Sequence, residues 1–324
     1  MSREKCFKSF LGPEIERFIA HKRSLGRRYS TEERSLVLLD AHLLKERITS
    51  LDVITPAVVD GFLLSRPRKR PRSYNHLRSV IGQLFSHLVS RGMLDRTPLQ
   101  SPPRRGSYQR NPFIFDRVSA KRLLAIAKTL HDSNGSPKSG AIYFALFAIL
   151  YGLGLRVGEA CRLSVRDVDL ERRLLIIRET KFYKTRLVPF GSKLEALISQ
   201  HLRHRQTVMA DQPLFSLRGG RAINPCTVSQ VFHALVPRLG LEIPPGVSSP
   251  RLHDLRHSFA VGVLTRWYRL GIDPQARLLD LSTFLGHVDV TSTAVYLTTT
   301  PELLEYANNR FKAFAAATLA EVAP

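Results

Sequence analysis

A stretch without apolar periodicity divides the chain into two parts. Residues 96–112 are rich in proline, glycine and arginine, whereas apolar residues recur at helical spacing on both sides of them. A segment of this composition contributes little to a packed core and is typical of a linker. We therefore expect a first domain over residues 1–97, a basic linker over 98–112 and a second domain over 113–324.

The first domain is predicted to be a bundle of four helices. Apolar residues at helical spacing place these helices over 13–25, from 30 or 31 through 43, from 56 through 63, and over 73–91. A basic turn, residues 66–72, separates the last two helices. The turn suits contact with a nucleic acid, although, taken alone, a solvated charged surface explains it equally well.

The second domain is predicted to be mainly helical with a small β-hairpin. Ser119 is expected to cap its first helix, and the strongly apolar run 141–153 predicts a buried helix. Two β-type runs, 174–178 and 185–189, predict the hairpin. Further helices are expected over 193–205, 227–239, 252–268 and 276–284, and an amphipathic tail helix over 301–319. The expected fold class is mainly α, with a helical first domain and a mixed α+β second domain.

The balance of charged residues points to a nucleic-acid partner. Lys and Arg number 49 against 27 Asp and Glu, which gives a formal net charge of +22. An excess of positive charge of this size lowers the stability of a compact fold through self-repulsion unless phosphates neutralise it. A ribosomal-type protein or a merely soluble basic protein is the alternative.

The cysteines and the N-terminal residues indicate the cellular compartment. Cys6, Cys161 and Cys226 are odd in number and far apart, so they predict neither a disulfide framework nor a zinc site. The first ten residues lack the apolar core of a signal peptide, and the apolar run 141–155 is too short to span a bilayer. We expect a protein of the reducing cytoplasm, associated with the nucleoid and not with a membrane.

The residues that carry chemistry concentrate between positions 250 and 297. His253 and Arg256 are spaced i, i+3 and would share one face of a helix, opposite the apolar residues of the same segment. His287 and Tyr296 add an imidazole and a phenol. A fixed cation, two imidazoles and a hydroxyl nucleophile suit chemistry on a phosphodiester. Taken singly, His253 or Tyr296 would be interpreted as a core residue.

Five short motifs follow one another along the second domain. They are Gly-Leu-Arg-Val-Gly-Glu at 154–159, a hairpin lysine before Arg-Leu-Val-Pro at 186–189, His-x-Leu-Arg-His at 253–257, Leu-Gly-His at 285–287, and a tyrosine nine residues after that histidine. In this order and spacing they resemble the tyrosine site-specific recombinases, the lambda-integrase-like family. The resemblance covers about residues 110–310. The helical first domain is similar to the core-binding domain of that family.

The resemblance implies a role for each matching residue. It makes Arg156 and Arg256 the arginines that bind the scissile phosphate, Tyr296 the nucleophile and Glu159 a supporting acid. The remaining implied catalytic residues are Lys181, His253 and His287. The hairpin reads Thr-Lys-Phe-Tyr-Lys instead of the usual Gly-Lys-Gly, so Lys184 is an alternative, but the spacing to the following Val-Pro pair favours Lys181.

These residue types fit the reaction that the resemblance implies. Guanidinium groups bind phosphate oxygens bidentately and remain charged at any relevant pH. A phenol with an ordinary pKa of about 10 needs nearby cations and a base, for which His253 is a candidate. Lys181 would protonate the leaving oxygen as a general acid. Residues 250–297 have no carboxylate cluster for a two-metal site. The histidines His253, His257 and His287 lack the spacing of zinc ligands. No cofactor is expected.

The resemblance also implies partners. They are double-stranded DNA and further copies of the same chain, which would form a homotetramer on paired DNA sites from free monomers, with accessory recombinases as further candidates. The tail helix would dock on a neighbouring protomer; packing of this helix on its own domain is the alternative. The intermediate would be a 3′-phosphotyrosine, and the role would be integration, excision or resolution of a mobile element such as a transposon. A type IB topoisomerase, which relaxes DNA without site preference, and a DNA-binding protein without catalysis remain alternatives. A cleavage assay distinguishes the DNA-binding protein without catalysis from the two enzymes.

Overall fold

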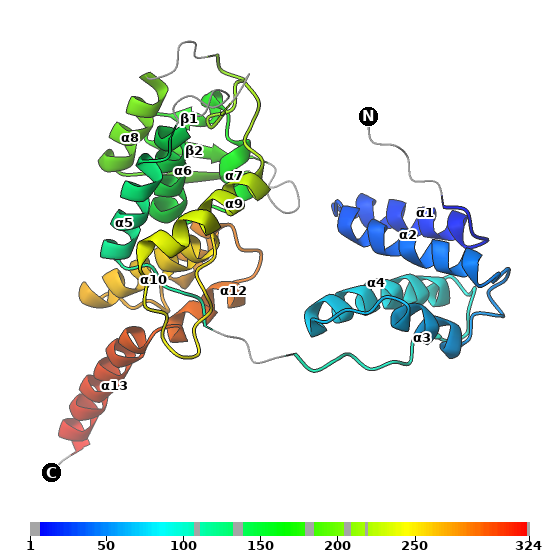
Figure 1. The fold of residues 1–324 in the computed structure, drawn as a ribbon. Helices are drawn as coiled ribbons and strands as arrows, with labels where there is room; N and C mark the ends of the chain where they lie inside the picture. The colour runs from blue at the N-terminus through cyan, green and yellow to red at the C-terminus, as the bar shows by residue number, and fades with distance from the viewer. Residues whose placement is uncertain are drawn as a thin grey trace. The chain divides into compact units, whose positions relative to one another are not determined.

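The computed structural model describes residues 7–106, 111–131, 139–178, 185–203, 209–217 and 220–322, with side chains as far as residue 316 in the last helix. The chain divides into two compact units, Met1–Gln109 and Arg110–Pro324 (Figure 1). Most described residues are helical, and a small antiparallel sheet lies in the second unit. The predicted fold class is confirmed.

The first unit contains four helices around one apolar core. They are α1 (Gly12–Ser24), α2 (Ser30–Lys45), α3 (Pro56–Leu64) and α4 (Pro71–Ser90). Proline stands in the first turn of three of them, where its missing N–H costs no hydrogen bond. Helix α4 buries one apolar face, which includes Leu77, Ile81, Leu84 and Leu88. Helical apolar periodicity therefore produces the bundle.

Part of the predicted linker is bound to this first unit. The side-chain amide of Asn75 in α4 donates to the Arg104 carbonyl and accepts from the Arg104 N–H, both at 2.8 Å. The Arg104 guanidinium lies over the ring of Tyr74, 3.9 Å from its centroid. Arg78 donates to the carbonyl of Ser101. The chain near residues 101–104 thus packs along α4.

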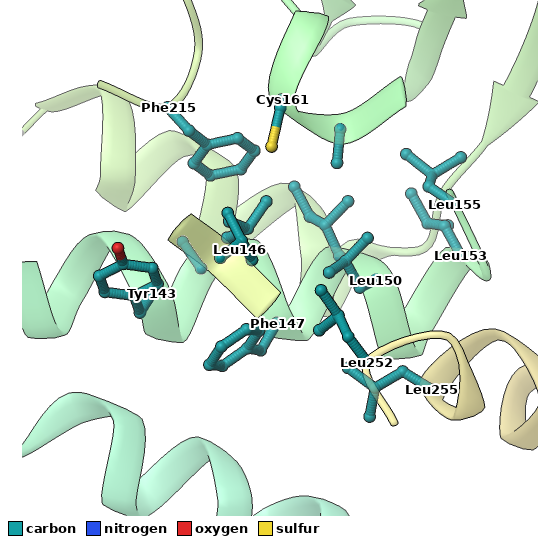
Figure 2. Packing of buried hydrophobic residues seen from close by; sticks show 14 of the residues in the cluster. Tyr143, Leu146, Phe147, Leu150, Leu153, Leu155, Cys161, Phe215, Leu252 and Leu255 are labelled. Atoms are coloured by element: carbon teal, nitrogen blue, oxygen red, sulfur yellow. The ribbon is translucent and has the colours of Figure 1, made fainter. Parts of the chain in front are cut away.

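The second unit is organised around helix α6 (Ser139–Leu153). This helix is apolar nearly all round, and eleven of its residues are buried. Figure 2 shows Leu146, Phe147 and Leu150 of α6 packed among side chains from other elements of the unit. The surrounding helices are α5 (Arg117–Lys128), α7 (Val157–Arg162), α8 (Ser192–Arg203), α9 (Pro225–Leu235) and α10 (Asp254–Arg269). The helix that precedes α6 begins one turn earlier than expected, because Asp116 is the cap and accepts from Ser119 N.

The sheet has three antiparallel strands in the order β1-β2-β3. They are β1 (Val168–Asp169), β2 (Leu174–Ile177) and β3 (Arg186–Pro189), and Ile177 pairs with Arg186 at the end of the β2-β3 ladder. Leu175 and Val188 face the core. The predicted hairpin is therefore present with one additional short strand. Its turn, with Lys181 and Lys184, lies outside the described residues.

A second, smaller core covers the outer side of α10. It is built with α11 (Leu278–Leu285), α12 (Thr291–Ala294), the 3-10 turn η4 (Val295–Thr298) and α13 (Pro301–Val322). Leu264, Leu281, Leu285, Tyr296 and Leu303 are buried in it. Tyr296 thus lies in a short turn held between α10 and α13, so packing of the C-terminal elements fixes where its hydroxyl lies.

Helix α13 is bound to its own unit along its first turns. Leu303 is fully buried, the ring of Tyr306 stacks on that of Tyr268, and Arg269 donates to Glu302. Farther along the helix, 67% of Phe311 is exposed. Among the described helices, none combines the length and the apolar character required to cross a membrane.

Candidate active site

The five described site residues come from four separate places in the second unit. Arg156 precedes α7, His253 precedes α10, and Arg256 lies in the first turn of α10. His287 follows α11, and Tyr296 lies in η4. Electrostatic interactions link Arg156 and Arg256 to both His287 and Tyr296, and link His253 to His287. The structure therefore brings these five side chains together, whereas Lys181 lies outside the described residues.

Three arginines bind three consecutive carbonyls at the C-terminal end of α11. Arg186 Nε donates to the Phe284 carbonyl at 2.9 Å, Arg256 Nη2 to that of Leu285 at 2.8 Å, and Arg156 Nη2 to that of Gly286 at 3.1 Å. Helix C-termini carry unpaired carbonyls and partial negative charge, so they bind cations favourably. The end of α11 therefore fixes the spacing of three positive groups.

Arg256 is the most deeply buried of the three. Only 1% of its surface is exposed, and its Nη1 donates to the Gly154 carbonyl at 2.7 Å, just beyond the end of α6. Burial, followed by the charge of Arg156, lowers the pKa of Arg256 to about 10, so it remains a cation at neutral pH. We expected Arg256 on a face opposite the buried residues of α10, and that prediction was wrong. The carbonyls of two other helix ends satisfy its donors inside the protein.

Glycine is required at both of these helix ends. Gly154 and Gly286 have φ values of +59° and +68°, in the left-handed region that side chains disfavour. A Cβ atom on Gly154 would lie 2.6 Å from the Phe259 ring, and one on Gly286 would lie 2.6 Å from Arg186 Nη1. The two glycines thus let the chain turn where the arginines meet the carbonyls.

Glu159 joins two of the arginines. Its carboxylate accepts from Arg156 Nη1 at 2.8 Å and from both Nη atoms of Arg186 at 3.1 and 3.0 Å. It also accepts from the backbone N–H of Arg156 at 3.0 Å. Burial alone would raise the pKa of Glu159, but the hydrogen bonds and charge of Arg186, then those of Arg156, hold it at about 2. Glu159 is therefore ionised and orients Arg156 from both its backbone and its side chain.

The hydroxyl of Tyr296 is bound to a histidine. Its oxygen lies 3.0 Å from Nδ1 of His257, and only 3% of the tyrosine is exposed. The other ring nitrogen of His257 lies 3.9 Å from the fully buried carboxylate of Asp254. Burial raises the pKa of Tyr296, while the charge and hydrogen bond of Arg256 act to lower it. Without DNA the phenol is thus protonated at neutral pH.

The three imidazoles of the site, two of which lie beside this phenol, are neutral. Burial, followed by nearby arginine charges, lowers the pKa of His257 and of His287 to about 4. The pKa of His253, whose surface is more exposed, shifts in the same direction through burial and the charge of His257. Nδ1 of His287 lies 2.7 Å from the hydroxyl of Thr293, a side chain with no exposed surface. Each imidazole can therefore accept or donate one proton at neutral pH.

Three residues of the site were missed by sequence reasoning. Arg186 and His257 both belong to motifs given above, Arg-Leu-Val-Pro and His-x-Leu-Arg-His. Their place in these motifs could have indicated that they belong to the site. Thr293 stands six residues after His287 in an ordinary run of threonine and serine, and no motif singled it out. Arg186 and His257 contact predicted residues that are 27 and 39 positions away in the chain, distances that local patterns do not report.

The arrangement can stabilise negative charge and move protons. Arg156 keeps 36% of its side chain exposed, although two of its nitrogens are held by Glu159 and Gly286. A guanidinium has five N–H groups, so donors remain for an anion. A tyrosine hydroxyl beside neutral imidazoles and buried cations is a nucleophile that needs only deprotonation. The site suits attack on a phosphate ester.

Known proteins are similar to this chain in sequence and in fold. A model described as the phage integrase family matches residues 115–302. The inferred integrase/recombinase y4rB of Sinorhizobium fredii is 31% identical, over 92% of this chain and 96% of its own. Tyrosine recombinase XerA of Thermococcus onnurineus is 33% identical, over 76% and 79%.

A solved structure of the Tn1549 transposon integrase, in complex with a circular intermediate DNA, has the same fold. Its TM-score is 0.65 at 16% identity, with coverage of 92% of this chain and 99% of that one. The resemblance that the motifs carried is confirmed. The chain belongs to the phage integrase family and is a tyrosine-type site-specific recombinase.

Proposed function

We propose that the chain binds double-stranded DNA at specific sites and exchanges strands through a covalent bond between Tyr296 and a 3′-phosphate. The observation that carries this proposal is the convergence of Arg156, Arg256 and His287 around Tyr296. Charge on the non-bridging oxygens rises in the transition state of such a reaction. Each hydrogen-bond donor fixed at that position lowers the activation free energy by about 3–4 kcal/mol.

In this proposal Arg156 and Arg256 bind the non-bridging oxygens. Their contacts to Glu159, Gly286, Gly154 and Leu285 hold both guanidiniums before DNA arrives. Positioning of this kind avoids reorganisation during the reaction. His253 and His287 are assigned to the same phosphate as neutral donors. Their lowered pKa values favour the neutral form.

The Tyr296 oxygen attacks phosphorus, and the bond to the sugar 5′-oxygen breaks. The phenolic proton passes to an imidazole; among described residues, His257 lies within hydrogen-bonding distance, whereas His253 was the sequence-based candidate. The leaving 5′-oxygen takes a proton from Lys181, which the resemblance assigns as general acid. The phosphotyrosine bond conserves the energy of the phosphodiester, so the 5′-hydroxyl of another strand can reverse the reaction.

The remaining parts of the proposal concern assembly. The helical first unit, with its basic turn at 66–72, is assigned to DNA binding as a core-binding domain. A homotetramer on two DNA sites would form from monomers through α13, whose exposed Phe311 would dock on a neighbouring protomer. The natural substrate would be a mobile element in the cytoplasm, with or without accessory recombinases.

A covalent-trapping experiment tests the proposed function. Full-length protein selects duplexes from a random-sequence pool, and these duplexes are then prepared with single nicks at successive positions. We expect a denaturant-resistant protein–DNA band from the wild type and from the control Tyr306→Phe, and none from Tyr296→Phe, although Tyr296→Phe still binds DNA. Labels on either side of the break report whether the tyrosine holds the 3′-phosphate.

The outcomes separate the candidates. An adduct with Tyr296→Phe shows that another residue is the nucleophile. Binding by the wild type without any adduct identifies a DNA-binding protein without catalysis. Equal relaxation of supercoiled plasmids with and without the selected sequence identifies a topoisomerase of type IB.

A further inference from the structure

Arg186 is a largely buried arginine whose contacts lead to the residues of the site. It is the first residue of β3, and 11% of its side chain is exposed. Its guanidinium donates twice to Glu159 in α7 and once to the carbonyl of Phe284 in α11. One side chain therefore connects the base of the hairpin to the two elements that hold Arg156 and His287.

The first consequence of these contacts is electrostatic. The Glu159 side chain is 3% exposed, so its negative charge needs partners inside the protein. Arg186 supplies two of its hydrogen bonds, in a bidentate pair, and Arg156 supplies one from its side chain. Because Arg186 neutralises the carboxylate, the charge of Arg156 remains available to a phosphate.

The second consequence is geometric. The guanidinium of Arg186 lies so close to Gly286 that a Cβ atom there would be 2.6 Å from Nη1. The same residue, Gly286, offers its carbonyl to Arg156 and precedes His287 in the chain. Arg186 thus packs against the turn that places both groups, so its removal would leave a cavity where the turn is now supported.

We infer that Arg186 is a positioning residue for DNA strand cleavage: it neutralises Glu159 and supports the turn at Gly286, and through them holds Arg156. This inference rests on the proposed function. Without Arg186, Glu159 has Arg156 as its remaining arginine partner among the described residues. The carboxylate then draws that guanidinium into a closed pair, away from the phosphate.

Four variants test the inference in single-turnover cleavage of the selected, nicked duplexes at saturating protein. Arg186→Met removes the charge and should lower the cleavage rate about 100-fold, while the dissociation constant for DNA changes less than about threefold. Arg186→Lys keeps the charge but not the planar guanidinium that binds a carboxylate bidentately, and its cleavage rate should be about tenfold lower than that of the wild type. Adding Glu159→Gln to Arg186→Met should recover about tenfold, because Arg156 is released.

Arg178→Met is the matched control. Arg178 follows β2 at the same end of the hairpin and pairs with Asp167, whose side chain is 6% exposed, but it does not contact Glu159. Its cleavage rate should equal that of the wild type. Equal rates for Arg186→Met and the wild type overturn the inference, as do equal losses for Arg178→Met and Arg186→Met. No recovery on adding Glu159→Gln overturns the path through Glu159.

A measurement without DNA separates this inference from the proposed function. Carbon-13 NMR follows protonation of the Glu159 carboxyl group, whose pKa of about 2 in the wild type should rise toward the ordinary 4.5 in Arg186→Met, because only the contacts to Arg156 remain to lower it. An unchanged titration overturns the inference even where cleavage is affected. Absence of any adduct from the wild type contradicts the proposed function instead, and the NMR result still decides the role of Arg186.

Discussion

The hydroxyl oxygen of Tyr296 lies 3.0 Å from Nδ1 of His257, although the two residues are 39 positions apart in the chain. The contact joins η4 to the first turns of α10, and both side chains are largely shielded from water. Nε2 of the neutral His257 faces the buried Asp254 carboxylate and carries the proton, so Nδ1 accepts the hydrogen bond that the tyrosine donates. The candidate nucleophile therefore rests in a defined position before DNA binds.

A double-mutant cycle measures this contact. Tyr296→Phe and His257→Phe each remove one partner while keeping a ring in place, and a buried neutral hydrogen bond contributes about 1 kcal/mol. We expect a coupling energy of about that size in urea unfolding monitored by circular dichroism. Tyr306→Phe, which loses an exposed contact to Arg269, should change stability by less than about 0.5 kcal/mol. A coupling energy near zero would contradict the hydrogen bond.

The neutral histidines give stability a specific pH dependence. Burial and nearby arginines hold the pKa of His257 at about 4, below its value of about 6.5 in the unfolded chain. The unfolded state therefore binds more protons between these values, so stability is complete above pH 6.5 and falls as the pH drops toward 4. At pH 5 this one residue accounts for about 2 kcal/mol.

Urea unfolding at pH 7 and pH 5 checks this expectation. The wild type should lose stability between the two values, and His257→Phe, which has no group to titrate there, should lose about 2 kcal/mol less. Glu159 does not interfere, because its depressed pKa of about 2 places its contribution below pH 4.5. Equal losses in the two proteins would show that His257 titrates normally.

Most of the secondary structure could be predicted because it follows local apolar periodicity. The four helices of the first unit, α6 and the β2-β3 pair all arise from patterns that each segment carries within itself. The cap at Asp116 was missed because serine and aspartate compete at neighbouring positions, and only the three-dimensional contact decides between them.

The site was predicted less completely, for a physical reason. Motif order singled out Arg156, Arg256 and Tyr296 as candidates, but a motif does not report which groups each side chain packs against. The burial of Arg256 depends on carbonyls of Gly154 and Leu285, which come from two distant helix ends. The sequence predicted Arg186 only as a residue of a strand. Its role in the site was missed because its partners are 27 and 98 positions away in the chain.

Gly286→Ala tests the packing of Arg186 against the end of α11. The added Cβ must enter a left-handed φ of +68° and lies 2.6 Å from Arg186 Nη1. We expect a loss of about 1–2 kcal/mol from the backbone and a further loss from displacement of the guanidinium. Gly240 has a φ of +56°, and a Cβ atom added there would have nothing within 4 Å. Gly240→Ala should therefore lose only the stability that the strained backbone costs. Equal losses by thermal unfolding would show that Arg186 does not fill this space.

The contact between His287 and Thr293 sets which nitrogen of the imidazole carries the proton. If the buried Thr293 hydroxyl donates to Nδ1 at 2.7 Å, the proton is on Nε2, the nitrogen left to face a phosphate. Thr293→Val keeps the shape and removes the donor, so we expect mixed tautomers in nitrogen-15 NMR and DNA cleavage about tenfold slower. Thr293→Ser keeps the hydroxyl and should preserve the Nε2–H form. In a His287→Gln background Thr293→Val should have no further effect on the cleavage rate, and a full tenfold loss there would show that Thr293 acts on something other than His287.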